Sequence, residues 1–413
     1  MSVASEIERI KGNIASAYTA ASGKGATMPD VQNSANLAGC IDTITGGGAT
    51  DEWQPNPNWW DIRKILDEDT RDYKGKVGVI LYNFNDVSDF QLSSSGMTAV
   101  ATSDGAFYSY ADNGANVSHN WDTSKDKDDG RGFKTRWVIY YYTTNTTNNT
   151  FGQATLNFGW AYNYIAYLVL RINCTSGSSF CSGHRLLEAI DNAGYSINGI
   201  NFNSFCSSCQ SLQKLPDGLD TSNGINFNNF CYGCNSLQKL PDGLDTSNGT
   251  DFNNFCYGCN SLQKLPDGLD TSNGTNFNNF CASCSSLQKL PDGLDTSNGI
   301  NFNNFCATCS SLQTTPEITM SANTVAITSK YSNPFVNGSW LKELQLTLPS
   351  NTNFWLDSSK RISIESFRYI ADHAPDVTAT PRTLTVGSTN ITRINAEDPT
   401  IITDLNAKGW SVA

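Results

Sequence analysis

The segment from Phe227 to Asp251 reads FNNFCYGCNSLQKLPDGLDTSNGTD, and the next 25 residues repeat it almost unchanged. Related copies follow one another from Phe202 to Pro316. Two cysteines recur in each copy with this period: Cys206, Cys231, Cys256, Cys281 and Cys306, and then Cys209, Cys234, Cys259, Cys284 and Cys309. A fixed period of this length is typical of a solenoid, in which each unit buries its apolar face only against its neighbours.

Within one unit, the spacing of apolar residues predicts a short helix followed by an extended segment. Four residues at i, i+3, i+4 and i+7 define one face of that helix: Phe227, Phe230, Cys231 and Cys234. Leu237–Leu240 is the extended segment, Pro241–Gly243 a turn, and Asp245–Gly249 a polar turn into the next unit. We expect the phenylalanines, cysteines and leucines to point inward, and paired strands of neighbouring units to lie roughly 4.8 Å apart.

The unit resembles the BspA-type leucine-rich repeat. FCYGCNSLQKL at 255–265, followed by LDTSNGTN at 269–276, is similar to that family's pattern in its length, second cysteine, leucine pair and DTSN turn. The sequence departs from the pattern at Cys231 and its equivalents, where a larger apolar residue is usual, and at Gly249, where valine is common. Most family members are extracellular adhesins and surface proteins, so the resemblance implies a binding role without catalysis.

The run of repeats has an irregular copy at its start. Four residues of the segment 178–201 stand one period before repeat positions: Cys181, His184, Leu187 and Ile190. We interpret 178–201 as a degenerate first coil, which caps the solenoid. At the other end, Thr314-Thr315-Pro316 replaces Lys-Leu-Pro, so the run is expected to end there.

Composition limits the classes of function. The chain has 413 residues, enough for two or three domains, and a formal net charge of −12. The negative charge argues against nucleic acid as a partner. No apolar run is long enough to span a membrane, and MSVASEIERIKGNIASAY lacks the pattern of a secretory signal. Ten of the 13 cysteines are repeat positions predicted to face a core, which argues against a disulfide framework.

The N-terminal segment 1–50 is predicted to be helical and to serve attachment or oligomerisation. A helix is expected over 5–21, where Ile7, Ile10 and Ile14 form a seam compatible with three strands. The alternative, an amphipathic helix docked on its own chain, stays open. The segment through residue 44 looks like the N-terminal segments of tail and other virion proteins in phages of Gram-positive gut bacteria, which attach the subunit to the particle. Gly46–Gly48 reads as a flexible linker.

The overall prediction is a multidomain α+β protein. A mainly antiparallel β domain is expected at 51–173, the leucine-rich-repeat solenoid at 178–316 and a C-terminal α/β cap at 317–413. A short helix is expected at 61–69, and β-branched and aromatic content predicts strands at 76–84, 106–110, 136–143, 154–158 and 165–172.

The cap is predicted from strands at 344–348, 383–386 and 410–412 and from helices at 364–373 and 396–408. The pattern LTVGSTN…INAEDPTIITDLNAKGW resembles the closing segment of BspA-type repeat proteins. This resemblance implies that the segment covers the last coil.

Neither metal binding nor catalysis is expected. Five C-x-x-C pairs suggest zinc, but both cysteines of each pair fall on the inward face, where a thiol is a small apolar filler. The three histidines, His119, His184 and His373, lie in no recognisable catalytic motif. Asp126, Asp128 and Asp129 do not have EF-hand spacing and are interpreted as a solvated acidic turn. A carboxylate pair for glycoside cleavage within 51–173 remains an alternative, because pairing in space is not visible in a sequence.

The surface of the repeats is the candidate for ligand binding. Two rows are predicted, one of glutamine and one of lysine: Gln213, Gln238, Gln263 and Gln288, and Lys214, Lys239, Lys264 and Lys289, with Gln313 ending the first row. The alternative is a solvated strand face that keeps the protein soluble. Tyr232 and Tyr257 are expected to stack on a sugar ring, with Asn235 and Asn260 bonding its hydroxyls. Trp53, Trp59 and Trp60 are a further aromatic set, of which at least two are expected in the core.

These observations lead to a structural and binding protein rather than an enzyme. The first hypothesis is a phage tail-fibre or receptor-binding subunit in the virion, without cofactor or metal. Its partners would be other virion proteins at the N-terminus, a host surface glycan or protein, and further copies of itself, with a trimer compatible with the isoleucine seam. The second hypothesis is a bacterial cell-surface adhesin, and the third is a glycan-cleaving enzyme in 51–173.

Overall fold

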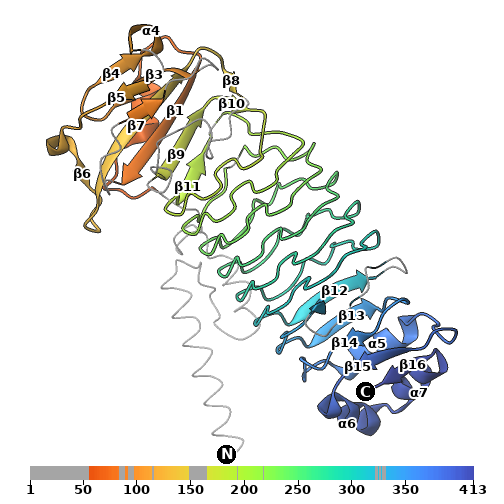
Figure 1. The fold of residues 1–413 in the computed structure, drawn as a ribbon. Coiled ribbons are helices and arrows are strands. Elements are labelled where there is room, and N and C mark those ends of the chain that lie inside the picture. The colour runs from red at the N-terminus through yellow and green to blue at the C-terminus, as the bar shows by residue number, and fades with distance from the viewer. Residues whose placement is uncertain are drawn as a thin grey trace, which may run out of the picture. The chain divides into compact units, whose positions relative to one another are not determined.

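The computed structural model describes residues 55–82, 89–91, 97–113, 116–147, 165–192, 194–216, 218–320, 324, 327 and 332–413. In these ranges the chain is a mixed α/β protein with few helices and with both antiparallel and parallel sheets (Figure 1). Asn56–Ala413 is one compact unit, and its buried apolar residues form a hydrophobic cluster that runs from Val77 to Trp410. No helix within the described ranges is long and apolar enough to cross a membrane.

Several predictions fall outside the described residues. They are the helix at 5–21 with Ile7, Ile10 and Ile14, the linker at 46–48, the side chain of Trp53 and the strand at 154–158. The domain boundaries within 56–413 also stay predictions.

The largest sheet has the strand order β11-β9-β1-β7-β3-β4, with β6 paired to β7. Its strands are β1 (Gly75–Tyr82), β3 (Met97–Thr102), β4 (Phe107–Ser109), β6 (Lys127–Asp128), β7 (Lys134–Tyr142), β9 (Ile165–Arg171) and β11 (Ala189–Asp191). All neighbouring pairs are antiparallel except β9 and β11. The strands predicted at 76–84, 106–110, 136–143 and 165–172 correspond to β1, β4, β7 and β9. β3 was not predicted, because its sequence MTAVAT is rich in alanine, a poor strand former.

Short elements complete this part of the chain: α4 (Tyr110–Asn113), the 3-10 turn η1 (Thr123–Lys125), and the paired strands β2 (Asp89–Gln91) with β5 (Asn116–Ser118) and β8 (Thr146–Thr147) with β10 (Asn173–Cys174).

The central strand β1 is buried along almost its whole length, which requires cover on both of its faces. Helix α3 (Ile62–Glu68) supplies part of this cover through the buried Ile62 and Leu66. A Cβ on Gly78 of β1 would lie 2.6 Å from Cγ1 of Ile62, so the glycine allows the helix to approach the strand. The helix predicted at 61–69 is confirmed, and Asp61 caps it by accepting a hydrogen bond from the Lys64 amide (3.1 Å).

The helix predicted inside each repeat is wrong. The chain there is a succession of turns whose amides alternate in direction. The amide of Phe227 donates to the carbonyl of Asp251 (2.8 Å), and that of Cys231 donates to Phe255 (2.9 Å), both in the next repeat. Between them, the Phe230 amide closes a turn on the Phe227 carbonyl (3.1 Å). Half of the hydrogen bonds thus join neighbouring repeats, which a helix would not allow.

Left-handed residues explain why no helix forms. Asn229 has φ 55° and Gly233 has φ 70°. The same two positions are left-handed in other repeats, at Ser204, Asn254, Asn279 and Asn304 and at Ser208, Gly258, Ser283 and Thr308. A right-handed helix cannot contain such residues, whereas asparagine tolerates this conformation and glycine adopts it freely. The i, i+3, i+4 spacing of apolar residues therefore reports inward-facing turns rather than helical periodicity.

The inward orientation predicted for the repeat phenylalanines, cysteines and leucines is confirmed. These side chains are buried in every described copy. The Phe227 ring stacks on Phe202 (centroids 5.6 Å apart) and on Phe252 (5.5 Å), and Phe230 stacks on Phe255 (5.3 Å). Parallel bridges join residues 25 positions apart, such as Asn226 and Asp251. In Figure 1 the repeats lie side by side in chain order between β11 and β12.

The same hydrogen-bond pattern extends beyond both ends of the sequence repeat. At the start, the Cys181 amide donates to Phe205 (2.8 Å), and Phe180 stacks on Phe205 (5.2 Å). Cys181, His184, Leu187 and Ile190 are all buried. At the end, the Cys306 amide of the last repeat donates to the carbonyl of Pro334 (2.8 Å), although Pro334 lies beyond the end of the repeat sequence. The irregular first copy is joined to the large sheet through β11, so it is not a free end.

Parallel strands follow the repeats. β12 (Thr314–Thr319) pairs with β13 (Glu343–Thr347), and β14 (Phe354–Trp355), β15 (Arg382–Thr385) and β16 (Trp410–Val412) form a second sheet. β13, β15 and β16 correspond to the strands predicted at 344–348, 383–386 and 410–412. Helix α5 (Ile364–His373) coincides with the helix predicted at 364–373.

The helix predicted at 396–408 corresponds to α7 (Thr400–Ala407), which begins later than predicted, and α6 (Ser388–Glu397), the helix before it, was not predicted. Asp398 between them is extended, with φ −152°, as favoured for a residue that precedes a proline, here Pro399. Gly409 ends α7 in the left-handed region, with φ 84°, so the predicted glycine stop is confirmed.

Candidate functional site

The predicted glutamine and lysine rows lie on the outside of the repeats. Their side chains are exposed, except that Lys214 is half-buried. The backbone holds the glutamine row in register, because the Gln263 amide donates to Gln238 (3.1 Å) and the Gln313 amide donates to Gln288 (2.8 Å). Identical side chains therefore recur once per repeat in a row that follows the succession of repeats.

Aspartates lie close to the lysine row. In one repeat Lys289 Nζ is 3.4 Å from the carboxylate of Asp292, and both side chains are well exposed. The sequence KLPD places an aspartate three residues after each row lysine. The row is therefore a mixed-charge surface, which an uncharged, hydroxyl-rich ligand can contact as well as a charged one.

Tyr232 and Tyr257 stack on each other. Their ring centroids are 5.0 Å apart and the rings are nearly parallel, at 7°. Tyr232 is 37% exposed. The equivalent Ala282 and Ala307 are buried, so the aromatic pair is confined to two repeats. Because the rings cover each other, only their outer faces remain for a sugar ring.

The repeat cysteines are buried free thiols. The second thiol of each pair donates to the carbonyl of the first cysteine in the preceding repeat, as from Cys234 Sγ to Cys206 (3.0 Å) and from Cys259 Sγ to Cys231 (3.1 Å). Burial raises the pKa of the Cys284 thiol to about 12. A thiol that stays protonated and donates to backbone is a poor metal ligand, since metals bind the thiolate. Within the described ranges, no three His, Cys, Asp or Glu side chains are grouped to hold a metal ion.

The interpretation of 126–129 as a solvated acidic turn is corrected by the structure. The side chain of Asp126 is 5% exposed and accepts hydrogen bonds from Arg136 at 2.6 and 3.1 Å. Asp129 is buried and accepts from the backbone and guanidinium of Arg131 (2.8 and 2.9 Å). Burial opposes ionisation of Asp129, but hydrogen bonds from Arg131 and Phe133 lower its pKa overall. Only Asp128 is exposed. The carboxylates of this segment hold the chain in place through arginine and backbone amides.

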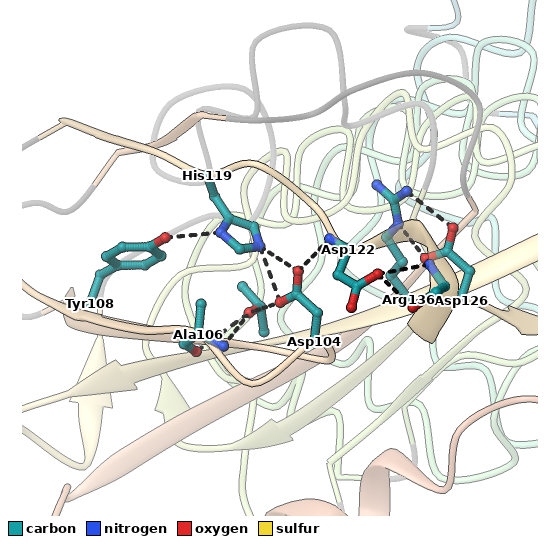
Figure 2. A network of polar contacts seen from close by, with 9 residues as sticks. Asp104, Ala106, Tyr108, His119, Asp122, Asp126 and Arg136 are labelled. Atoms are coloured by element: carbon teal, nitrogen blue, oxygen red, sulfur yellow. Dashed lines mark hydrogen bonds and ion pairs between the residues drawn. The ribbon is translucent and has the colours of Figure 1, made fainter.

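A polar network surrounds His119 (Figure 2). Nδ1 of His119 lies 2.9 Å from the hydroxyl of Tyr108, and its Nε2 lies 2.9 Å from Asp104. Asp104 also accepts from the Thr102 hydroxyl (2.6 Å) and from the Asp122 amide (2.9 Å). These hydrogen bonds outweigh burial and lower the pKa of Asp104.

A tyrosine, a histidine and a carboxylate are hydrogen-bonded in this order, as are the nucleophile, the base and the orienting group of some catalytic sites. Here His119 and Asp104 are 5% and 6% exposed, and the network joins the β3–β4 turn to the segment 119–122. The sequence carries no motif for it, because the antiparallel turn between β3 and β4 brings Asp104 close to Tyr108 and His119 reaches them from the segment after β5.

The other histidines and tryptophans have structural surroundings. Burial lowers the pKa of His184 to about 4, and His373 stacks on Tyr369, with centroids 3.9 Å apart. Trp59 is buried against Tyr82 and Tyr167, at 6.1 Å from each ring. Trp60 is half-buried, and its Nε1 donates to Thr135 (3.3 Å).

A pocket of about 420 Å³ lies where the last repeat meets the C-terminal segment. Six residues from four separate stretches of the chain line it: Gln313, Trp340, Lys342, Lys360, Arg361 and Arg393. No sequence pattern predicts this site, because its residues come together only in the fold. The adjacent Lys360-Arg361 was the one local signal.

No protein-family model matches this sequence, and no curated protein matches it.

Proposed function

We propose that this chain is a structural and binding protein of a phage virion, a tail-fibre or receptor-binding subunit. In this proposal the 25-residue repeats form a solenoid that recognises a ligand on the host cell. The segment 1–50 attaches the subunit to other virion proteins and assembles copies of the chain. The observation that carries the binding role is the register of the repeats, which sets exposed glutamine and lysine side chains in two ordered rows.

The geometry of the rows suits extended ligands. Repeated side chains at a constant interval can contact repeated groups of a polymer such as a glycan, so that many weak contacts add up along its length. Tyr232 and Tyr257 offer aromatic faces for sugar rings at the same repeats. The resemblance of the repeat to surface adhesins and that of the N-terminal segment to virion proteins point to the same role.

The surroundings of four carboxylates in the β-rich segment support the binding role. A general acid needs a raised pKa, but hydrogen bonds lower the pKa of Asp104, Asp128 and Asp129. Asp126 is engaged by Arg136. The His119 network is buried and joins chain segments, which supports a structural role for it.

Glycan-array binding by the purified full-length chain tests the proposal. A variant carrying Lys239→Glu, Lys264→Glu and Lys289→Glu reverses the charge of the exposed part of the lysine row. Its matched control carries Lys64→Glu, Lys74→Glu and Lys125→Glu, three exposed lysines outside the repeats. We expect the row variant to bind its array ligands roughly tenfold more weakly, and the control to bind normally. Equal binding by both variants would show that the row is not the recognition surface, and release of shortened glycans would support the enzyme hypothesis.

Two further observations would distinguish a virion protein from a cell-surface adhesin. We expect the full-length chain to be an oligomer in solution, and a chain beginning at Asp51 to be a monomer, by absolute mass. Tail and lysis genes beside the gene would agree with a virion protein, whereas cell-wall anchoring genes would favour the adhesin.

A further inference from the structure

The pocket at the end of the repeats concentrates positive charge. Four of its six lining residues are cationic: Lys342, Lys360, Arg361 and Arg393. Glu343 and Glu397 lie 3.6 Å from Lys342 and 4.0 Å from Arg393, but both are exposed surface partners, and such pairs attract weakly. On a chain with a net charge of −12, this is a local reversal of sign that favours an anion.

The walls of the pocket are held in place by hydrogen bonds. Arg393 donates to the carbonyl of Ile362 (2.8 Å), and Asn390, one helical turn away in α6, donates to the carbonyl of Ser359 (2.8 Å). The amide of Ser363 donates to the carbonyl of Lys342 (2.8 Å). The loop carrying Lys360 and Arg361 is therefore tied to both neighbouring walls. A site held in this way loses little conformational entropy when a ligand binds.

An aromatic ring stands beside the charges. Trp340 is 48% exposed, and the guanidinium of Arg361 lies over its ring at 4.0 Å from the centroid. Stacking on the ring orients the guanidinium and leaves its N–H groups free to form a two-point contact with a carboxylate or phosphate. The exposed remainder of the indole can pack against an apolar ring face.

We propose that this pocket binds an acidic saccharide, a sugar whose carboxylate or phosphate group contacts Lys360 and Arg361 while its ring packs beside Trp340. The volume of about 420 Å³ falls within the range of roughly 300–1,000 Å³ for small-molecule sites. A single-stranded nucleic acid shares the chemistry of phosphate and stacking, but it is bound in grooves that follow several phosphates. The compact pocket and the negative chain favour the saccharide. The site is separate from the exposed lysine row, so it stands even if that row binds nothing.

Calorimetric titration of the full-length chain tests this assignment. The probes are a hyaluronan tetrasaccharide for the carboxylate, glucose 6-phosphate for the phosphate, maltotetraose as the neutral sugar, inorganic phosphate, and a short single-stranded oligonucleotide. We expect at least one acidic saccharide to bind at least roughly tenfold more tightly than maltotetraose and than inorganic phosphate, and the binding to weaken with salt. The probe that binds identifies which anionic group the pocket prefers.

Three variants locate the binding. Lys360→Gln with Arg361→Gln should weaken binding at least roughly tenfold, because it removes charge-assisted hydrogen bonds. Lys342→Gln, at an exposed position that leaves the loop intact, should weaken it in the same direction. The control, Lys64→Gln with Lys125→Gln, makes the same charge change at two exposed lysines outside the repeats and outside the pocket, and should leave this binding unchanged.

The assignment is overturned if no acidic saccharide binds at millimolar concentration, or if maltotetraose binds equally well. It is also overturned if the oligonucleotide binds more tightly than every saccharide, or if Lys342→Gln and the double variant both bind like wild type. Equal loss of binding in the Lys64 and Lys125 control would show that the overall charge of the chain, rather than this pocket, drives the binding, and would also overturn the assignment.

Discussion

At the scale of single residues, the repeat cysteines combine two roles. Each thiol is small enough to fill the interior beside the stacked phenylalanine rings, and the second of each pair also satisfies a backbone carbonyl of the preceding repeat, as Cys284 does for Cys256 (3.0 Å). Burial keeps the Cys284 thiol protonated by raising its pKa to about 12. The stability of the repeats is therefore linked to pH on the alkaline side.

The sign of that linkage follows from the raised pKa. Below about pH 8.5, the pKa of an unfolded thiol, the thiol keeps its proton in both the folded and the unfolded state. Its contribution to the unfolding free energy is then fully present. Between that value and about 12, only the unfolded state loses the proton, so stability falls as the pH rises. We expect Cys284→Ala to reduce the slope of unfolding free energy against pH by about 1.4 kcal/mol per pH unit between pH 9 and 11 in urea titrations.

A matched control separates this effect from packing. Leu287→Ala, at a buried position in the same repeat, should lower the stability at every pH and leave the slope as in wild type. If Cys284→Ala keeps the wild-type slope, the thiol is not held protonated by the fold.

At the scale of the elements, each repeat depends on two left-handed positions. They turn the chain so that alternate amides point along the row of repeats, which is how Gly258 donates to Ala282 (2.8 Å). Apart from Thr308, these positions hold glycine, asparagine or serine, which have a lower conformational cost there than β-branched residues. The element is therefore specified by a few turn residues as well as by the apolar pattern.

Two glycines of one repeat allow a direct test. Gly258 has φ 71°, whereas Gly268 has no neighbouring atom within 4 Å of an added Cβ and is not left-handed. Gly258→Ala should cost about 1–2 kcal/mol of unfolding free energy, because alanine is strained at positive φ. Gly268→Ala should change it by less than about 0.5 kcal/mol. Equal effects of the two substitutions in urea unfolding would contradict this account of the turn.

At the scale of the whole molecule, the repeats connect the large sheet with the C-terminal segment. β11 pairs with β9 at one end, and the last repeat continues into β12 and β13 at the other. Because each repeat bonds to its neighbours at a constant offset, removal of one unit should leave the remaining pairing intact.

Deletion of Phe252–Asn276, one full period, is therefore expected to give a folded protein. Asp251 then precedes Phe277 in the position that Asn276 holds, and the rings and thiols remain in register. The circular dichroism signal per residue should match that of the wild type. Unfolding by urea should remain cooperative, but its midpoint should lie at a lower urea concentration. Deletion of residues 252–271 breaks the register and should abolish cooperative unfolding; if both deletions behave alike, the units are not equivalent.

From the sequence alone, the period, the inward-facing residues and the four strands β1, β4, β7 and β9 of the largest sheet could be predicted. Such features depend on local patterns, namely the 25-residue spacing and the β-branched and aromatic content of β1, β7 and β9. The sequence did not determine the backbone inside each repeat, because apolar spacing of i, i+3 and i+4 is common to helices and to the turns that Asn229 and Gly233 create. The break between α6 and α7 at Asp398 likewise depended on one proline.

The candidate sites likewise differ in how far the sequence predicts them. The glutamine and lysine rows were predictable, since a repeated residue in a repeated fold must form a row. The His119 network and the cationic pocket, in contrast, exist only once the chain has folded. Tyr108 and Asp104 lie together because β3 and β4 pair, and His119 reaches them from the segment after β5. The pocket residues Gln313, Trp340, Arg361 and Arg393 meet because the last repeat, two loops and α6 converge. Charge, aromatic surface and volume act together only when the chain brings them within contact distance, and no short stretch of this sequence carries that information.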